Sequence, residues 1–316
     1  MNIKYFIFLF FTGCFLLLSP ATASFESFDI SGKVVGLGNA VTSISDDAAG
    51  LIYNPSGCSL TEGKSLCLSY TKPYLGIGNL NNGYFGVSLP VIDNFLSCGV
   101  YLDYFGEDIY YERTLGFVLG VKKLILEKQF LSVGVAVKNM SKGVFSNEYV
   151  EENSFFSAKR ETAGLGFDAG ITYRIVDVGS LGVAVLNINE PNISFVDEDK
   201  VFMVIKTGVS FYFMKELLTA LDFNYSSSNY TVNLGADYKI QKTGLAVRVG
   251  GELGSLDYKS INCGIGYEAE QKGMGMIMSI DYGFKFPIGF IENSGTHIVS
   301  ITLKEIPKKV VETEDK

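Results

Sequence analysis

The sequence predicts an all-β protein: a transmembrane antiparallel β-barrel of about 14 strands, with an N-terminal plug or hatch segment in its lumen. Three observations predict it. Apolar and polar residues alternate over long segments, whereas no run of about 20 apolar residues follows Leu18 to form a membrane-spanning helix. A glycine-rich stretch of about 40 residues precedes the first alternating segment and fits no strand.

The N-terminus has the features of a secretion signal. Lys4 supplies a positive charge, residues 5–18 form an apolar core, and Ala21-Thr22-Ala23 is a small-x-small cleavage site. We therefore expect a signal peptide at 1–23, a plug segment at 24–63, a barrel at 64–304 and a charged periplasmic tail at 305–316. An alternative is lipidation at Cys14, although the apolar run continues beyond that cysteine.

The alternation is clearest at residues 163–175, where every odd position is apolar. The even positions are small, polar or charged: Gly164, Gly166, Asp168, Gly170, Thr172 and Arg174. Because successive side chains of a strand point to opposite faces, this segment has one apolar face and one polar face. Soluble sandwiches also alternate, but their strands usually run about five or six residues. These segments run about nine to thirteen, the length of a tilted membrane strand.

The predicted strands are 64–72, 82–89, 95–105, 112–123, 129–140, 162–174, 180–188, 201–213, 217–225, 230–240, 244–253, 260–268, 275–286 and 296–304. An even count is typical of bacterial barrels. Connections such as 90–94 and 124–128 are short, whereas 141–161, 189–200 and 287–295 are long. Short periplasmic turns and long outer loops would place both termini in the periplasm, so we expect a protein of the outer membrane, in contact with its lipid.

The inward face of this barrel is expected to be rich in glycine, which lets another backbone approach closely. The glycines on that face are Gly164, Gly166, Gly170, Gly208, Gly235, Gly264, Gly266 and Gly283. A fourteen-strand lumen is too wide for its own side chains to fill. We therefore expect the segment before the first strand to occupy it.

Residues 36–57 carry a long motif in this segment. Its marked positions are Gly36, Gly38, the acidic pair Asp46-Asp47, and the turn residues Asn54, Pro55 and Gly57. With Asp281-Tyr282-Gly283 and Gly295-Thr296-His297 near the other end, it resembles the PorV/PorQ (UPF0164) proteins, relatives of the FadL long-chain fatty acid transporters. Ser56 stands where the family usually has alanine, and the last strand runs into charged residues instead of ending on an aromatic one.

The resemblance implies two functions that the residues leave open. One is a FadL-like channel for hydrophobic small molecules such as long-chain fatty acids, in which the segment around Asn54-Pro55 moves as a hatch. The other is a PorV-like, non-transport role as a partner of secretion components at the outer membrane, with the 141–161 loop as a contact surface. The Asn54–Gly57 stretch is equally consistent with a simple turn, and the long loop with an ordinary loop.

The remaining features concern the lumen charges and the possibility of enzymatic, metal-binding or nucleic-acid-binding functions. We expect the lumen charges to pair with one another or with the plug: Asp168, Arg174, Lys206, Asp222, Asp237, Arg248, Asp281 and Lys285. His297 is the single histidine and has no evident catalytic partner, so we expect no enzyme. No cysteine spacing predicts a metal site, we expect no cofactor, and the net charge of −8 argues against nucleic acid.

Overall fold

The computed structural model describes residues 25, 29–146, 148–152, 160–196, 198–227, 229–271, 273–289 and 294–306. The expected signal peptide, Cys14 and the tail beyond Ile306 lie outside the described residues, so these assignments stay predictions. In the described part, no helix has the length and apolar character needed to cross a bilayer.

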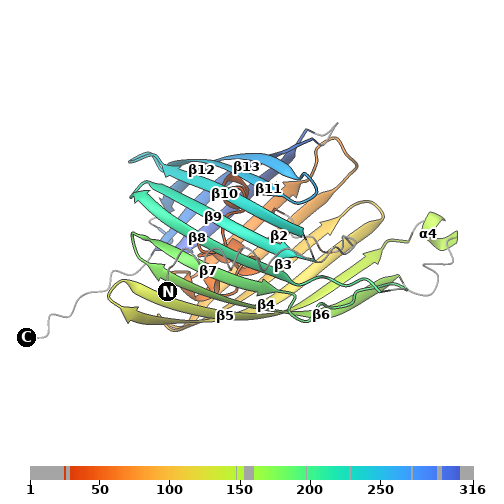
Figure 1. Cartoon of the computed structure of the whole chain (residues 1–316), viewed down its shortest axis with the longest axis horizontal. Helices are drawn as coiled ribbons and strands as arrows, with labels where there is room; N and C mark the ends of the chain where they lie inside the picture. The colour runs from red at the N-terminus through yellow and green to blue at the C-terminus, as the bar shows by residue number, and fades with distance from the viewer. Residues whose placement is uncertain are drawn as a thin grey trace, which may run out of the picture.

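Fourteen antiparallel strands close into one barrel, with β1 paired to β14 (Figure 1). The strands are β1 (Ser65–Lys72), β2 (Asn81–Ile92), β3 (Leu96–Gly106), β4 (Tyr110–Leu126), β5 (Gln129–Val144), β6 (Glu161–Ile175), β7 (Gly179–Leu186), β8 (Val204–Met214), β9 (Leu217–Ser226), β10 (Asn229–Lys239), β11 (Leu245–Gly254), β12 (Lys259–Gln271), β13 (Met276–Ile288) and β14 (Thr296–Glu305). Each strand pairs with its neighbours in sequence, so no crossover is needed. The predicted all-β antiparallel barrel and its count of fourteen strands are confirmed, whereas the role of the N-terminal segment as a plug or hatch stays a prediction.

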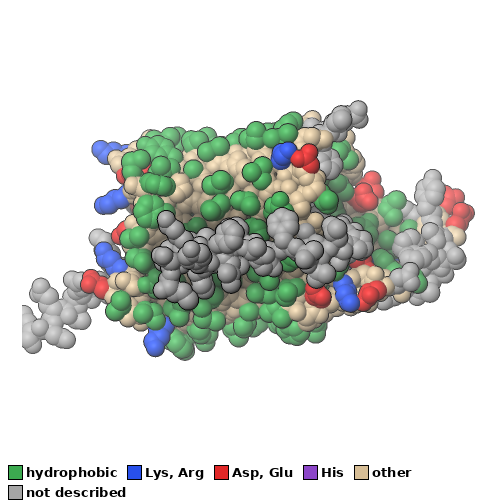
Figure 2. Space-filling model, viewed as in Figure 1, with side chains coloured by type: hydrophobic (Ala, Val, Ile, Leu, Met, Phe, Trp, Pro, Cys, Tyr) green, Lys and Arg blue, Asp and Glu red, His purple; other side chains and the backbone are tan. Residues whose placement is uncertain are grey.

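The two faces of each strand differ as the alternation predicts. On β6, the outward Leu165 and Phe167 are 53% and 46% exposed, whereas the inward Asp168 and Thr172 are buried. Figure 2 shows hydrophobic side chains over the visible wall and charged side chains mostly at its two ends. The outer face is therefore apolar where lipid would surround it, and the polar residues line the interior.

Several strand ends differ from the prediction by up to four residues, and two of these differences alter a connection. β5 continues to Val144, beyond the expected end at residue 140, because Lys142 and Met140 are still buried on the inward face and pair with β6. The long connection after it is correspondingly shorter and contains a short helix, α4 (Glu148–Glu152). β8 begins at Val204 instead of residue 201, because residues 187–203 fold back on themselves, as an isolated bridge between Asn192 and Lys200 shows.

An N-terminal segment, residues 29–63, lies inside the barrel (Figure 1). It contains α2 (Gly32–Gly36), a 3-10 turn η1 (Ala48–Ile52) and α3 (Gly57–Leu60). α2 packs against β11–β14, η1 against β1–β3 and α3 against β2–β5, so the segment contacts the wall on several sides. Its apolar side chains form most of the main buried cluster, which also includes Tyr84, Tyr101 and Val118 from the strands.

The chain enters and leaves at opposite ends of the barrel. Phe25 lies beside Glu112 at the start of β4, where the long connections are. Ile306 follows β14 and bonds to Gly275 in the β12–β13 turn, at the end with the short turns. The expectation that both termini lie in the periplasm stays a prediction.

Candidate functional site: the lumen and its N-terminal segment

Wall glycines make room for the backbone of the N-terminal segment. A Cβ added to Gly182 on β7 would come within 2.5 Å of the carbonyl oxygen of Thr42. One added to Gly235 on β10 would overlap the carbonyl of Leu37, and one added to Gly283 on β13 would come within 2.7 Å of that of Gly32. Side chains at these positions would therefore push the segment off the wall.

Most glycines predicted to line the lumen contact this segment, but not all. Gly170, Gly208, Gly235, Gly264 and Gly283 face its atoms, whereas Gly164 faces the β7–β8 connection, Gly166 faces Lys138, and Gly266 faces Arg248 and Asp281. Gly36 of the motif lies against Arg248 of β11 and Gly264 of β12, and Gly38 lies against Gly251 of β11. Gly38 also has a φ of +59°, a conformation that favours glycine.

Asp222 on β9 holds the middle of the segment. Its Oδ2 accepts hydrogen bonds from the backbone N–H groups of Val41 (2.9 Å) and Thr42 (2.8 Å) and from the Thr42 hydroxyl (2.6 Å). The residue is fully buried. A carboxylate with three donors is a strong anchor, because hydrogen bonds to a charged group are the stronger kind. Lys206 of β8 lies over the ring of Tyr53, 4.9 Å from its centroid.

The Asn54-Pro55-Ser56-Gly57 turn is fixed to β5 and β6. Asn54 Oδ1 accepts from the Ser56 N–H (3.1 Å) and hydroxyl (2.8 Å), while its amide donates to the Thr42 carbonyl (2.7 Å) and to Thr172 (3.2 Å). Ser132 of β5 donates to the Ser56 carbonyl (2.6 Å). The stretch is therefore a turn that also makes polar contacts with the wall, and its movement as a hatch stays a prediction.

The acidic pair Asp46-Asp47 joins the segment to the wall near the short-turn end. Asp46 pairs with Arg174 of β6 (3.1 Å), with Lys304 of β14 (3.6 Å) and with Lys33 of α2 (3.7 Å). Asp47 caps η1 through the N–H groups of residues 49 and 50. Burial tends to raise the pKa of Asp46, but Lys304, Arg174 and Lys33 outweigh it and hold the pKa below its ordinary value.

The other lumen charges also form pairs. Arg248 binds Asp237 (3.1 Å) and Asp281 (2.6 Å), and Asp168 binds Lys138 of β5 (2.9 Å). Lys285 lies between Glu252 (3.0 Å) and Asp29 of the N-terminal segment (3.4 Å). All of these charges are buried or nearly so, and buried charges are tolerated when such partners surround them.

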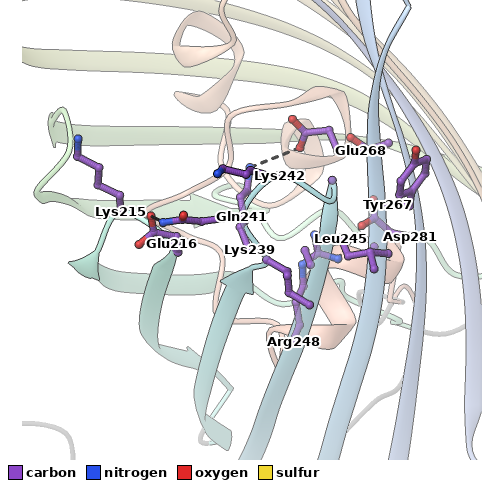
Figure 3. A pocket seen from close by; sticks show the side chains of 15 residues that line it. Lys215, Glu216, Lys239, Gln241, Lys242, Leu245, Arg248, Tyr267, Glu268 and Asp281 are labelled. Carbon is purple, nitrogen blue, oxygen red and sulfur yellow. Dashed lines mark hydrogen bonds and ion pairs between the residues drawn. The ribbon is translucent and has the colours of Figure 1, made fainter.

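A vestibule of about 320 Å³ opens at the short-turn end, among residues of β8–β13 (Figure 3). Lys215, Glu216 and Lys242 lie on its turns, Lys239 pairs with Glu268 at 3.4 Å, and Arg248 and Asp281 also line it. Charges of both signs surround this space. Apolar side chains such as Ile240 and Leu245 lie between these charges, so the lining is mixed.

Sequence reasoning missed several members of this site. Ser132, Lys138 and Lys304 contact partners in the lumen, and each lies at a position on the inward face of its strand. The inward phase of the alternation is the signal that identifies them. No sequence signal showed which of them contact the segment, since that depends on how the segment turns inside the barrel.

His297 lies beside exposed Tyr282 on the wall, whereas Cys58 and Cys67 belong to the buried cluster inside the barrel. His297 Nδ1 shares a hydrogen bond with the Tyr282 hydroxyl (2.7 Å), and its ring lies beside Phe284. The described cysteines, Cys58, Cys67, Cys98 and Cys263, are free. Burial raises the pKa of Cys58 to about 11, which disfavours its thiolate. Within the described residues, no three His, Cys, Asp or Glu side chains form a group able to hold a metal ion.

Comparison with known structures shows the fold. The chain is similar to the CymD monoaromatic hydrocarbon channel (TM-score 0.60, 13% identity, 87% of this chain and 97% of that one). It is also similar to a Pseudomonas aeruginosa FadL homologue (0.59, 11%, 90% and 100%) and to the Pseudomonas putida toluene transporter TodX (0.53, 12%, 87% and 98%). At such low identity these similarities establish a FadL-like barrel and no shared activity.

Sequence comparison defines the family. No curated protein sequence matches the chain. The family model of the type IX secretion system membrane protein PorP/SprF matches residues 48–303, most of the chain. The expected resemblance to PorV/PorQ is not confirmed by this match and stays a prediction. An outer-membrane location is consistent with both the barrel and the matched family. On this match, the chain belongs to the PorP/SprF family of type IX secretion system membrane proteins.

Proposed function

We propose that this protein is a closed outer-membrane barrel that acts as a non-transport partner in type IX secretion, with the N-terminal segment as its plug. The observation that carries the proposal is the polar attachment of this segment within the lumen. Asp222, Thr172 and Ser132 bond to its backbone and polar groups, and Arg174 and Lys304 pair with Asp46. The vestibule at the short-turn end has charges of both signs among its lining residues.

These features suit a barrel that stays shut better than one that conducts. A segment anchored by buried ion pairs and hydrogen bonds leaves its site only if many polar groups lose their partners together. The family match supports the secretion role, because its model describes membrane proteins of that system. Such a protein would contribute its outer rims to other components. In the β5–β6 connection, Phe145 is 43% exposed and contacts Tyr111, while Phe155 and Phe156 lie outside the described residues.

A second candidate is passage of hydrophobic small molecules such as long-chain fatty acids, with the segment around Asn54-Pro55 moving as a hatch. The FadL-like fold favours it, since the similar structures include a hydrocarbon channel and a toluene transporter. Here a substrate would cross when the Asn54 contacts with Thr172 and Thr42 open.

A deletion strain separates the two. We expect loss of a secreted type IX substrate from the culture medium, with unchanged uptake of radiolabelled long-chain fatty acid, and restoration by the full-length gene. Loss of uptake with normal secretion would overturn the proposal in favour of transport. Unchanged secretion and unchanged uptake would overturn both.

A further inference from the structure

The β7–β8 connection, residues 187–203, folds into the barrel mouth instead of projecting from it. Ile193 is fully buried, and Val201 is 3% exposed. Both pack with Met140, an inward residue of β5, and Phe25 lies against the same cluster. An ordinary surface loop would leave such apolar side chains in water, so this connection has its own small core inside the wall.

The wall offers the connection a fitted site. A Cβ added to Gly164 on β6 would lie 3.2 Å from Ile193 Cγ1 and 3.4 Å from Pro191. At the base of the connection, the Asn187 N–H donates to Asp168 (2.7 Å), whose carboxylate also pairs with Lys138. The missing side chain at Gly164 thus lets the connection lie close to the strand.

An ion pair joins the connection to β5. The ammonium of Lys142, on β5, binds the carboxylate of Asp199 and lies 5.6 Å from the centroid of the Phe195 ring. The Lys142 side chain is 6% exposed, and that of Asp199 is 24% exposed. Asp199 is tied in turn to the buried tip, because its carbonyl accepts from the Ile193 N–H (2.9 Å) and its own N–H donates to Asn192 (2.9 Å).

We propose that the β7–β8 connection is a lid over the long-connection mouth, held shut by the Lys142–Asp199 pair and separate from the N-terminal plug. Its apolar contacts are few, and its ion pair is reached by solvent at Asp199, so it opens more readily than the N-terminal segment leaves the lumen. The lid goes beyond the proposed function, since it controls access to the lumen from this end whether the barrel transports or assists secretion.

Access to Met140 tests the lid. The reporter is the full chain with Met140→Cys and every other cysteine replaced by alanine, folded in lipid vesicles and treated with a water-soluble maleimide. We expect slow labelling with the lid shut. Asp199→Asn should raise the rate by about tenfold, because a reaction that needs opening follows the opening equilibrium and the substitution breaks a buried pair. Ile193→Asp should raise it at least as much, because an isolated carboxylate cannot stay buried there.

Glu198→Gln is the matched control. Glu198 lies on the same connection and pairs with Lys200 at 2.6 Å, but both side chains are largely exposed. Its labelling rate should equal that of the reporter. Retained resistance of the barrel to unfolding in cold SDS verifies that each variant is folded. The lid proposal would be overturned if the reporter is labelled as fast as Ile193→Asp. It would also be overturned if Glu198→Gln and Asp199→Asn accelerate labelling equally. Neither result depends on secretion or uptake.

Discussion

Single polar side chains, each with several partners, attach the N-terminal segment to the wall. Asp222 accepts three hydrogen bonds at one oxygen, and Asn54 bonds both its own turn and Thr172. The strands supply these groups from positions whose neighbours on the inward face are often glycine. Where the segment lies against the wall, many facing residues either bond to it or, as glycines, leave space for it.

Asp222→Asn tests the strongest of these anchors. The substitution keeps the shape but removes the charge, so the N–H groups of Val41 and Thr42 would donate to a neutral amide oxygen in place of a carboxylate. We expect a loss of about 2 kcal/mol in the free energy of unfolding, the range for hydrogen bonds to a charged group. Urea unfolding in lipid vesicles, followed by tyrosine fluorescence, measures it. Asp257→Asn, at a side chain that is 88% exposed, is the control and should leave the midpoint in place. Equal midpoints for the two variants would show that Asp222 is no anchor.

Acid should weaken the attachment at Asp46. The folded pKa of this carboxyl lies below its ordinary value of 3.8 because Lys304, Arg174 and Lys33 surround it. Its contribution to stability is therefore complete above pH 3.8 and is lost as the pH falls through the folded pKa. In Asp46→Asn the stability should be lower at neutral pH and should fall less steeply below about pH 4. Unfolding midpoints at several pH values measure this, and parallel curves for the two proteins would contradict it.

At the scale of elements, the fit between the segment and the strands depends on backbone approach. β7, β10 and β13 each place a glycine against a carbonyl of the segment. These contacts leave no room for a methyl group, whereas elsewhere in the barrel a glycine has open space around it. An added side chain at a glycine is therefore expected to be tolerated in some strands and to displace the segment in others.

Gly235→Ala should destabilise the protein by about 1–3 kcal/mol, because the added Cβ overlaps the Leu37 carbonyl and forces the backbone to shift. The matched control is Gly83→Ala on β2, where an added Cβ meets nothing within 4 Å. That change should be neutral or slightly stabilising, since glycine weakens a strand. The unfolding midpoints of the two variants, measured side by side, test this prediction. If Gly83→Ala is as unstable as Gly235→Ala, close backbone approach is not the cause of the destabilisation.

For the molecule as a whole, the lumen is occupied at two levels. The N-terminal segment lies against strands on several sides of the barrel, and the β7–β8 connection lies above it at the long-connection mouth. The vestibule at the other end is lined by charges. The proposed function and the proposed lid both follow from this arrangement.

Removing residues 24–63 behind the signal peptide should convert the barrel into an open pore. A fourteen-strand wall is too wide for its own side chains to fill, so a large new conductance is expected in planar bilayers. The Ile193→Asp variant, with the segment in place, is the control and should conduct no more than the parent. Unchanged conductance of a folded barrel that lacks residues 24–63 would contradict the proposal that the N-terminal segment is a plug.

The strand pattern and the segment that precedes it were predictable because both are local. Alternation at period two marks which residues face lipid, and this placed all fourteen strands within a few residues of their observed ends. It also identified the inward charges Arg174, Asp222 and Arg248. The partners of those charges were not predictable, because the contact of Arg174 with Asp46, 128 residues away, depends on how the segment turns inside the closed wall.

The sequence by itself determined a barrel with one apolar and one glycine-rich polar face, because successive side chains of a strand point to opposite faces. Only the tertiary structure decided what the polar face meets. Closure of β1 on β14 brings β5, β6 and β9 around one short segment. The β7–β8 connection in turn packs Ile193 and Val201 onto Met140. Those contacts join residues far apart in the chain, and the local alternation of apolar and polar residues does not predict which distant residues meet.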